Sequence, residues 1–346
     1  MITRGLLTQD LDYVLEQART ELLGYRDKEI LITGASGLLG FWIAAVILEA
    51  NSRYDLNLHI TVTSRLESDP KKLGFYLQGD PIKVHVIDLF GISKFPLKSE
   101  IFFDIIFHTA ISNNKNSDFS NLNKDLNLIK LFTNQSELTC SSIYFPSSGA
   151  VYGRQPLDLN RIPENLETNL KFGPLTQYGE FKDTAEKILK KHASGQSINL
   201  ITPRIFTLYG PKLPLDKQFA IGNFVGMAKR GLQIEINGNQ NSKRSYLYMA
   251  DFVIWTLKAL RLNISQSIHI GSDEIVTISE LANIISEKFE CEFAPKILDQ
   301  NSKASNYIPS TADTRLLLGV DNQITFSNGL DRWILWLKVS DQMRAE

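Results

Sequence analysis

The feature of this sequence that most constrains its fold is a set of evenly spaced glycines directly after a short apolar segment. Glu29–Thr33 has the length and composition of a buried strand. Gly34, Gly37 and Gly40 follow it, where a helix over Leu38–Ala50 is predicted to begin. Gly34 suits a tight turn, Gly37 lets the backbone approach a pyrophosphate, and Gly40 lets the helix pack closely on the strand. The segment predicts a dinucleotide-binding turn, with a plain turn between strand and helix as the alternative.

The alternation of strand and helix continues to about residue 203. Further buried strands are predicted at His59–Thr63, Lys83–Ile87, Asp104–His108, Ser142–Pro146 and Ile198–Thr202. Further helices are predicted over Leu122–Thr133 and Tyr178–His192. Strands that alternate with helices form crossover units and a parallel sheet covered on both faces. We therefore predict an α/β protein with a doubly wound parallel sheet of the Rossmann type.

The pattern divides the chain into three parts. Residues 1–28 form an N-terminal helical extension, in which apolar residues at helical spacing predict one amphipathic helix over Leu7–Leu23. Residues 29–203 form the dinucleotide-binding Rossmann domain. Residues 204–346 form mainly a smaller α/β substrate-binding domain, because glycine and proline there separate shorter elements. We expect the chain to return to the Rossmann domain around residues 244–272.

Composition excludes several other classes of protein. The 346 residues contain 37 Lys and Arg against 38 Asp and Glu, a formal charge of −1, so we expect no nucleic-acid partner. The two cysteines, Cys140 and Cys291, are too few for a disulfide framework or a cysteine-built zinc site, and no histidine pattern suggests a metal. No apolar run is long enough for a membrane helix, and the first residues show no secretory signal. We expect a cytoplasmic protein that binds neither a metal nor a membrane.

The end of the second predicted strand should face the adenosine ribose of a dinucleotide. An acidic residue there binds the 2′-hydroxyl, whereas an arginine accommodates a 2′-phosphate. The strand ends in Ser64 and Arg65, and the next carboxylate is Glu67. Arg65 therefore favours NADP over NAD, with a solvated loop charge as the alternative. Asp88, just past the third strand, is placed to accept a hydrogen bond from the adenine amine or to cap a helix.

A tyrosine and a lysine four residues apart, Tyr178 and Lys182, lie at the start of another predicted helix. Both side chains project from one helix face. A nearby ammonium stabilises a phenolate and lowers the pKa of the tyrosine, which makes it usable as a general acid or base near neutral pH. Ser148 follows a predicted buried strand, at the edge of the sheet where ligands bind, and can donate to the same substrate oxygen. An exposed helix pair is the alternative for Tyr178 and Lys182.

These segments occur in an order that is more specific than any one of them. The motifs, spread over about residues 29–272, are Thr33–Gly40, His108–Ala110, Ser147–Gly153, Tyr178–Lys182, Pro203–Arg204, Tyr209–Pro211 and Arg244–Asp251. Together they resemble the extended short-chain dehydrogenase/reductases, and specifically the NAD-dependent epimerase/dehydratase family that acts on nucleotide sugars. The resemblance implies a nucleotide-sugar substrate and a homodimer built on a helix bundle that includes Tyr178–His192.

The resemblance also implies roles for individual residues. Tyr178 becomes the acid/base, and Lys182 holds the nicotinamide ribose and tunes the tyrosine. Ser148 forms a hydrogen bond to the substrate hydroxyl. Arg244 matches the arginine that binds the substrate diphosphate, a bidentate task suited to a guanidinium, with a surface charge as the alternative. His108 lies at a strand end, where we expect it to pack and to order the backbone.

Cofactor contacts are implied at the strand ends and at the start of the first long helix. Besides the three glycines they are Ser36, Leu38, Ser64, Arg65, Asp88, Leu89, Ala110, Tyr178, Lys182, Pro203 and Ile205. Ala110 lines the nicotinamide in this assignment, and Pro203 and Ile205 lie near its carboxamide. The expected cofactor is NAD or NADP, and Arg65 favours NADP.

Three departures from the family pattern bear on the reaction. Relatives that eliminate water, the 4,6-dehydratases, carry an acidic residue one or two places after the catalytic Ser/Thr, where this chain has Gly149 and Ala150. Without a carboxylate there, proton abstraction beside a keto carbon has no evident base, so elimination is disfavoured, and decarboxylation for the same reason. Lys124-Asp125 replaces a usual Gly-Thr pair, and Thr207 replaces a usual diphosphate-binding asparagine.

Two reactions use the remaining residues. In an epimerase, Tyr178 removes the proton of a sugar hydroxyl while hydride passes to the nicotinamide, and the keto sugar then takes the hydride back on its other face. In a nucleotide-4-keto-sugar reductase, NADPH delivers hydride once and Tyr178 protonates the alkoxide. We place the epimerase first and the reductase second. A dinucleotide-binding regulator without turnover is a third hypothesis, disfavoured because it has no need of Ser148, Tyr178 and Lys182 together.

Overall fold

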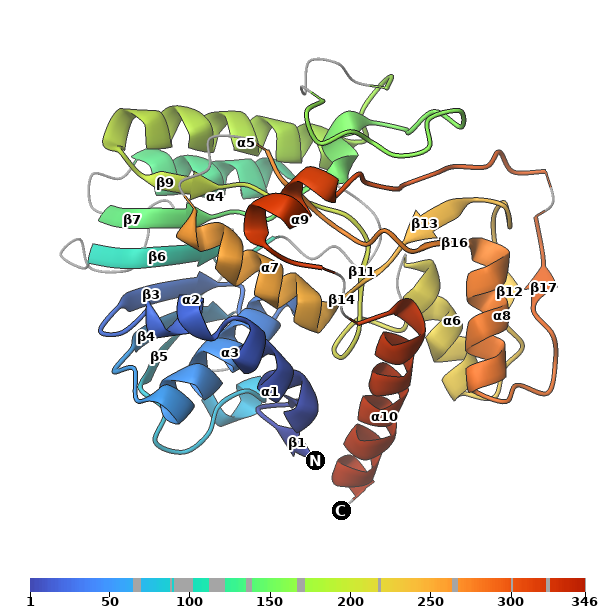
Figure 1. Ribbon diagram of the computed structural model, residues 1–346, viewed down its shortest axis with the longest axis horizontal. Coiled ribbons are helices and arrows are strands. Elements are labelled where there is room, and N and C mark those ends of the chain that lie inside the picture. Colours follow the sequence, from blue (N-terminus) through green and yellow to red (C-terminus); the bar gives the residue numbers. More distant parts are fainter. Residues whose placement is uncertain are drawn as a thin grey trace.

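The computed structural model (Figure 1) covers most of the chain. It describes residues 1–64, 70–87, 89, 102–111, 122–134, 139–166, 172–216, 219–262, 267–299, 301–321 and 324–345. Two of the predicted cofactor contacts, Arg65 and Asp88, lie outside these residues.

Six parallel strands form the central sheet, in the order β5–β4–β3–β6–β7–β9. Their bounds are β3 Glu29–Thr33, β4 His59–Ser64, β5 Ile82–Val86, β6 Phe102–His108, β7 Thr139–Tyr144 and β9 Asn199–Ile201. This is the strand order of the two-halved dinucleotide-binding fold, which reverses direction between β3 and β6. The six predicted strands and the Rossmann-type α/β class are confirmed, with strand ends moved by a few residues.

Successive strand residues point to opposite faces of the sheet and are apolar on both, so helices cover both faces. These helices are α3 (Leu38–Tyr54), α4 (Leu122–Asn134), α5 (Gln177–Gln196) and α7 (Met249–Arg261). Ile30 and Ile32 belong to one core cluster with residues of α3 and α7. Leu31, between them, belongs to another cluster with Leu128 of α4. Helix α5 packs on α4, and α3 is apolar on most sides because it is buried beneath other helices.

The N-terminal extension differs from the single helix predicted over Leu7–Leu23. It consists of β1 (Ile2–Thr3), β2 (Leu6–Leu7), α1 (Thr8–Gln17) and α2 (Arg19–Leu23). The two strands pair antiparallel, and the helix is interrupted at Ala18, where φ is −113° and ψ is 22°. The predicted apolar stripe is nevertheless buried. It packs mainly against α7 and α3.

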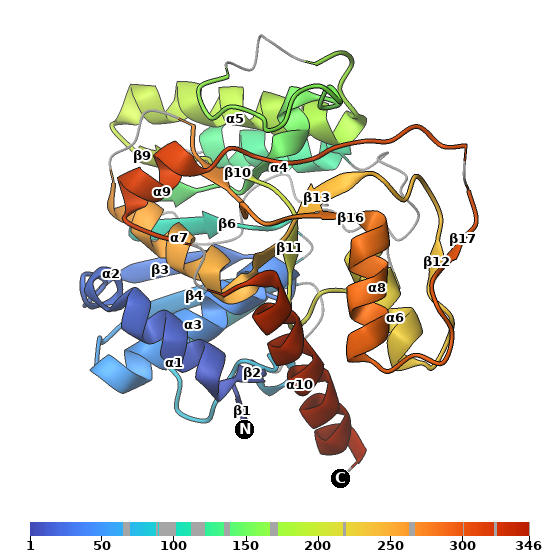
Figure 2. The same cartoon turned by 45° about the vertical axis from the view of Figure 1, so that its right-hand side comes forward.

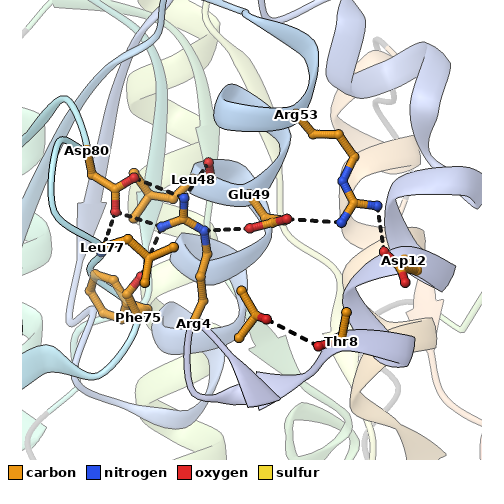
Figure 3. Close-up of polar contacts among 10 residues, drawn as sticks. Arg4, Thr8, Asp12, Leu48, Glu49, Arg53, Phe75, Leu77 and Asp80 are labelled. Atoms are coloured by element: carbon orange, nitrogen blue, oxygen red, sulfur yellow. Dashed lines mark hydrogen bonds and ion pairs between the residues drawn. The ribbon is translucent and has the colours of Figure 1, made fainter. Parts of the chain in front are cut away.

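Arg4, at the turn between β1 and β2, ties the extension to the Rossmann domain (Figure 3). Its guanidinium is 1% exposed and donates to Asp80 at 2.6 and 2.9 Å and to Glu49 at 2.9 Å. The carbonyl oxygens of Leu48 and Phe75 accept two further hydrogen bonds. Glu49 belongs to α3, and Asp80 to the segment between β4 and β5. One side chain therefore holds three segments together.

Several short elements lie outside the central sheet. They are η1 (Pro70–Leu73), β8 (Ser147–Ser148), η3 (Gly149–Tyr152), β10 (Arg204–Ile205), β11 (Leu208–Tyr209), β14 (Leu247–Tyr248), β15 (His269–Ile270) and α9 (Ala312–Leu318). Strands β8, β10 and β15 form a second parallel sheet, and β11 pairs with β14. The second sheet brings segments from three distant parts of the chain side by side.

The remaining elements form a smaller lobe beside the Rossmann domain, shown to the right in Figures 1 and 2. They are α6 (Ala220–Lys229), β12 (Glu235–Ile236), β13 (Lys243–Ser245), β16 (Ile275–Thr277), α8 (Ile278–Lys288) and β17 (Lys296–Ile297). The last helix, α10 (Phe326–Ala345), runs back toward the N-terminus in both views. Its Trp336 Nε1 donates to the carbonyl oxygen of Gly5 at 2.9 Å. Among the described helices, none combines the length and the apolar character needed to span a membrane.

Candidate active site

The glycine turn after β3 has the geometry of a close backbone approach. Gly34 has a φ of +71°, in the left-handed region that favours glycine, and an added Cβ would lie 2.7 Å from Ala110 Cα. A Cβ on Gly40 would lie 2.5 Å from the carbonyl oxygen of Gly34. At Gly37 the nearest atom to an added Cβ is that same oxygen, at 3.2 Å. Gly34 and Gly40 are therefore required for packing, while Gly37 faces outward.

The start of α3 is shaped to receive an anion. Gly37 caps the helix and has no side chain to cover the first N–H groups. Ser36 and Gly37 are exposed, and Leu38, the first helical residue, is half-buried. Because the first N–H groups of a helix lack partners within it, and its dipole is positive there, the turn fits the pyrophosphate of a dinucleotide. The individual contacts of Ser36, Gly37 and Leu38 stay predictions.

Beside the glycine turn, the end of β6 is tied to the end of β3. Thr109 Oγ1 donates to the carbonyl oxygen of Thr33 at 2.6 Å, and the N–H of Ala110 donates to Thr33 Oγ1 at 3.2 Å. Thr33 Oγ1 also lies 2.8 Å from His108 Nδ1. Burial and the nearby charge of Lys182 lower the pKa of His108 to about 3, so the ring is neutral. These bonds order the backbone where the strand order reverses, which is where such sheets bind ligands.

The adenosine side of the predicted site is described in part. Ser64 is the last residue of β4, and its carbonyl oxygen accepts from the N–H of Ile87 at 2.9 Å. Leu89 is buried in the core cluster on the α4 face. Since Arg65 and Asp88 lie outside the described residues, the preference for NADP stays a prediction.

Ser148 and Tyr178 come from elements that pack directly on each other. Ser148 ends β8 and caps η3, where its Oγ accepts from the N–H of Ala150 at 3.2 Å. Tyr178 lies in the first turn of α5, and its hydroxyl forms a hydrogen bond with Ser148. An added Cβ on Gly179 would lie 2.5 Å from the carbonyl oxygen of Ala150. The glycine after Tyr178 therefore allows α5 to approach η3 closely enough for the two hydroxyls to meet.

Lys182 connects this pair to the glycine turn. Its ammonium donates to the carbonyl oxygen of Pro146 at 2.5 Å and lies 5.7 Å from the ring centre of Tyr178 and 4.4 Å from that of Phe145. Phe145 stacks on His108, at the end of β6. Burial lowers the pKa of Lys182 to about 7, against an upward effect of nearby carboxylates. The lysine is therefore poised to change its charge near neutral pH.

The pKa of Tyr178 moves in the direction opposite to the one expected from its spacing to Lys182. Burial is the largest effect and raises the pKa to about 12, although the hydrogen bond with Ser148 lowers it. The ammonium of Lys182 donates to the carbonyl oxygen of Pro146 and lies 5.7 Å from the centre of the Tyr178 ring, and burial remains the largest effect on the pKa of the phenol. In this structure Tyr178 is a neutral phenol and a proton donor.

Asp125 of α4 adds a carboxylate to the surroundings of this pair. It is 2% exposed, and its charge raises the pKa of both Lys182 and Tyr178. It therefore favours the ammonium form of the lysine and the neutral form of the phenol. The unusual Lys124-Asp125 pair thus bears on the acid/base groups themselves.

Comparison with known proteins places the chain in a family. A model of the NAD dependent epimerase/dehydratase family matches residues 30–271, more than half of the chain. The chain belongs to this family. The predicted resemblance to this family is thereby confirmed.

Two curated members of the family illustrate the range of reactions. The dTDP-4-dehydro-6-deoxyglucose reductase of Escherichia coli is 26% identical over 330 residues, which cover 89% of this chain and 97% of that protein. UDP-glucuronic acid decarboxylase 1 of Danio rerio is 25% identical over 166 residues, 47% of this chain and 39% of that protein. The chain spans between 39% and 55% of the length of the decarboxylases it matches.

Solved structures of the family share the fold. Epimerase Mth375 from Methanothermobacter thermautotrophicus has a TM-score of 0.75 at 19% identity, covering 95% of this chain and 97% of that one. The UDP-glucuronic acid 4-epimerase of Bacillus cereus, in complex with UDP-glucuronic acid and NAD, has a TM-score of 0.72 at 19% identity, covering 90% and 99%. At such identities the likeness concerns the fold alone.

Two residues that sequence reasoning missed, Phe206 and Tyr307, fill the space beside Ser148. A Cβ on Gly149 would lie 2.6 Å from the Phe206 ring and 2.7 Å from the Tyr307 hydroxyl. That hydroxyl is 3.3 Å from Ser148 Oγ. Position 149 therefore has no room for the acidic side chain expected of a dehydratase in this family. Tyr307 follows Ser148 by 159 residues and belongs to none of the motifs, so no signal in the sequence pointed to it.

Arg244, the predicted diphosphate ligand, is held in place by its own chain. Its Nη1 donates to the carbonyl oxygens of Lys243, at 2.9 Å, and Ser305, and its Nη2 donates to Ser305 Oγ at 3.0 Å. Burial lowers the pKa of the guanidinium. Its backbone bridges to Tyr307, whose hydroxyl contacts Ser148. Its contact with a diphosphate stays a prediction.

A buried ion pair, also missed, fixes α5 to the second sheet. Glu186, one helical turn after Lys182, accepts from Arg204 Nη2 at 3.0 Å and from the hydroxyl of Ser147. Arg204 Nη1 donates to the hydroxyl of Tyr152 at 2.6 Å. The network therefore sets the position of β8 relative to the helix that carries Tyr178 and Lys182.

Pro203 and Ile205, the predicted carboxamide neighbours, flank the serine strand. The carbonyl oxygen of Pro203 accepts from the N–H of Ser147 at 2.9 Å. Ile205 is the register partner of Ser148 in the parallel pair β8–β10. Both lie beside the candidate site, and their contact with a cofactor stays a prediction.

Proposed function

We propose that this member of the family catalyses reversible hydride transfer between a bound dinucleotide and a ring carbon of a nucleotide sugar. The observation that carries the proposal is the meeting of Ser148, Tyr178 and Lys182 beside Phe145, which stacks on His108 at the end of β6. His108 in turn contacts Thr33, the residue before the glycine turn. A bound NAD or NADP supplies the hydride acceptor and donor. The first candidate reaction is epimerisation by transient oxidation of a sugar hydroxyl to a ketone.

The hydroxyls of Tyr178 and Ser148 act on one substrate oxygen. Because burial keeps Tyr178 protonated, it can give a proton to a developing alkoxide while Ser148 donates a second hydrogen bond. In the oxidative direction the phenolate form of Tyr178 takes the proton of the substrate hydroxyl and becomes the neutral phenol. The hydrogen bond from Ser148 lowers the pKa of Tyr178, and an ammonium at Lys182 acts in the same direction, so both favour the phenolate that this step needs. The same three groups therefore serve both directions, as an epimerase requires.

A nucleotide-4-keto-sugar reductase is the second candidate. The neutral phenol of Tyr178 is the protonation state that reduction of a ketone uses. The similarity to the Escherichia coli dTDP-4-dehydro-6-deoxyglucose reductase extends over 97% of that protein. A reductase exchanges its dinucleotide in every turnover, whereas an epimerase regenerates the one it holds.

Elimination of water and decarboxylation are disfavoured on the local geometry. Elimination needs a general base near the carbon next to the ketone, and the family resemblance implies an acidic residue in the same segment for decarboxylation. The positions after Ser148 carry Gly149 and Ala150, and Phe206 and Tyr307 occupy the space that a side chain at position 149 would need.

The test of the proposal is turnover with a defined panel of substrates. The protein is incubated with four substrates: UDP-glucose, UDP-glucuronic acid, UDP-N-acetylglucosamine and dTDP-4-dehydro-6-deoxyglucose. Oxidation of NADH and NADPH is followed by absorbance, and the products are followed by NMR. The protein is then denatured and the released dinucleotide assayed. Retained NAD(H) with an epimerised product supports the first candidate, and an empty site that consumes NADPH supports the second. If the protein converted none of these four substrates, both candidate reactions would be contradicted.

The variant Tyr178→Phe separates an enzyme from a dinucleotide-binding regulator. Loss of the hydroxyl removes the proton donor and leaves the ring packing, so we expect turnover to fall by about 100-fold or more while dinucleotide affinity is kept. Unchanged biological output in cells that carry the variant would favour the regulator.

The homodimer that the family resemblance implies is also a proposal. It rests on α5 and α4, which pack together and whose outer sides would meet a second copy. Light scattering on the purified protein tests it, and a monomer at micromolar concentration would exclude it.

A further inference from the structure

A second tyrosine touches the candidate catalytic serine. The hydroxyl of Tyr307 lies 3.3 Å from Ser148 Oγ and 3.4 Å from the carbonyl oxygen of Ile205. Its ring packs on Phe206, with 4.7 Å between ring centres. The segment that carries it is anchored by its backbone bridge to Arg244. The phenol thus reaches Ser148 from a segment other than α5, the helix that carries Tyr178.

The hydrogen-bonding capacity of Ser148 limits what it can do. A serine hydroxyl has one hydrogen and two acceptor lone pairs. The N–H of Ala150 uses one lone pair, at 3.2 Å. When Tyr307 donates its hydrogen to Ser148, the second lone pair is filled as well. The hydrogen of Ser148 is then free to be donated only outward, to Tyr178 or to a substrate oxygen.

The alternative orientation has the opposite result. When the hydrogen of Tyr307 turns to the Ile205 carbonyl, at 3.4 Å, the phenol oxygen is open to accept the hydrogen of Ser148, since either oxygen of their 3.3 Å contact can be the donor. A Ser148 that gives its hydrogen to Tyr307 offers the substrate none. The orientation of the Tyr307 hydroxyl therefore limits where the catalytic serine can donate.

We propose that Tyr307 is a positioning residue that fixes Ser148 as a hydrogen-bond donor to the substrate oxygen, and this inference rests on the proposed function. A keto or alkoxide oxygen is purely an acceptor and needs two donors, Ser148 and Tyr178, whereas a hydroxyl can also donate. Tyr307 therefore matters most at the stage when the substrate oxygen is a ketone or an alkoxide. Its burial, which raises the pKa of the phenol, is in keeping with a permanent donor.

Charged and titratable groups around Tyr307 do not change this assignment. Arg244 lies on one side and favours the phenolate, while Tyr178 and Tyr152 lie near and disfavour it. Burial exceeds these effects, so the hydroxyl keeps its hydrogen over the neutral range. Close packing also fixes the ring, because the hydroxyl and Phe206 leave no room for a Cβ on Gly149.

The test is a double-mutant cycle of Tyr307→Phe and Ser148→Ala, measured as kcat and KM on the substrate that the panel identifies. Loss of a single neutral hydrogen bond predicts that Tyr307→Phe lowers kcat about 3- to 10-fold and leaves KM within about twofold. In the Ser148→Ala background the same change should have no further effect, because the serine through which it acts is gone. An equal loss in both backgrounds, no loss in the wild-type background, or a change in KM alone would overturn the proposal.

Tyr144→Phe is the matched control. Its hydroxyl is also buried and lies 2.8 Å from Thr256 Oγ1 of α7, a contact that does not involve Ser148, so its removal should leave kcat and KM unchanged. A kcat loss equal to that of Tyr307→Phe would overturn the proposal, since removing any buried phenol hydroxyl would then suffice.

A readout without turnover separates this inference from the proposed function. If no member of the panel reacts, the proposed function fails on its own. The melting temperatures of the same four proteins still decide whether the Tyr307–Ser148 bond exists. A double variant that loses less than the sum of the two single losses supports the bond, and additive losses overturn it.

Discussion

Replacing Arg4 with methionine tests whether the N-terminal extension is a structural part of the Rossmann domain. The change removes a guanidinium that is 1% exposed and leaves the carboxylates of Asp80 and Glu49, which are 7% and 14% exposed, without this cation. Methionine replaces most of the apolar stem and adapts to the space, so the loss of pairing dominates. Removing one partner of a buried ion pair costs about 3–5 kcal/mol, because the other charge stays buried.

This free energy translates into a measurable shift of the melting temperature. Unfolding entropy averages about 2.1 cal/mol/K per residue, which makes about 0.7 kcal/mol/K for 346 residues. A loss of about 3–5 kcal/mol therefore lowers Tm by about 4–7 °C when the chain unfolds in one step. Differential scanning calorimetry of both proteins at pH 7 measures the shift. A single transition in each protein is the condition for converting Tm into free energy.

Arg53→Met is the matched control for this experiment. Arg53 pairs with the same Glu49 at 3.0 Å and with Asp12 at 2.5 Å, as Figure 3 shows, but the arginine is 37% exposed and Asp12 is 52% exposed. An exposed pair contributes about 0–1 kcal/mol, so Tm should fall by at most about 1–2 °C. Equal shifts in the two variants, or an Arg4→Met protein that melts with the wild type, would refute the reasoning.

Three further predictions concern the site. Gly40→Ala places a Cβ 2.5 Å from a backbone oxygen of the glycine turn, so NAD(P) affinity measured by calorimetric titration should fall about 10-fold or more, while Gly195→Ala, in open space, should not change it. Asp125→Asn removes a charge that raises the pKa of both Lys182 and Tyr178, so the alkaline limb of the kcat/KM profile should move to lower pH; an unmoved limb would contradict this. Gly149→Asp should lower Tm without creating dehydratase activity, because Phe206 and Tyr307 fill the space; a folded variant that releases a 4-keto-6-deoxy product would show otherwise.

The central sheet was predictable because its signals are local and repeated. Each strand is a short run of apolar residues, because both faces of the sheet are covered by helices. Such a run can be identified from the sequence without knowing which strands lie beside it. The N-terminal helix was only partly predictable. Its apolar spacing identified the buried stripe, but the break at Ala18 and the strand pair before it depend on how the segment packs on α3 and α7. Arg4 showed no pattern at all, since its partners Glu49 and Asp80 lie 45 and 76 residues away.

The same distinction between local spacing and tertiary surroundings explains which features of the candidate site could be predicted from the sequence. The four-residue spacing of Tyr178 and Lys182 predicted that they share a helix face, and they do. It could not predict the direction in which the pKa of Tyr178 shifts. That shift depends on burial, on the carboxylate of Asp125 in another helix, and on a lysine that donates to Pro146.

Tyr178 and Lys182 differ in how firmly they hold their protons. At neutral pH Tyr178 keeps its proton, whereas Lys182 is close to its own pKa and is present in both its charged and its neutral form. Binding of a dinucleotide ribose beside Lys182 and a sugar oxygen beside Tyr178 would change the surroundings of both groups at once. The acid/base state of this site is therefore expected to be set when cofactor and substrate are both present, and pH profiles with and without bound dinucleotide should differ.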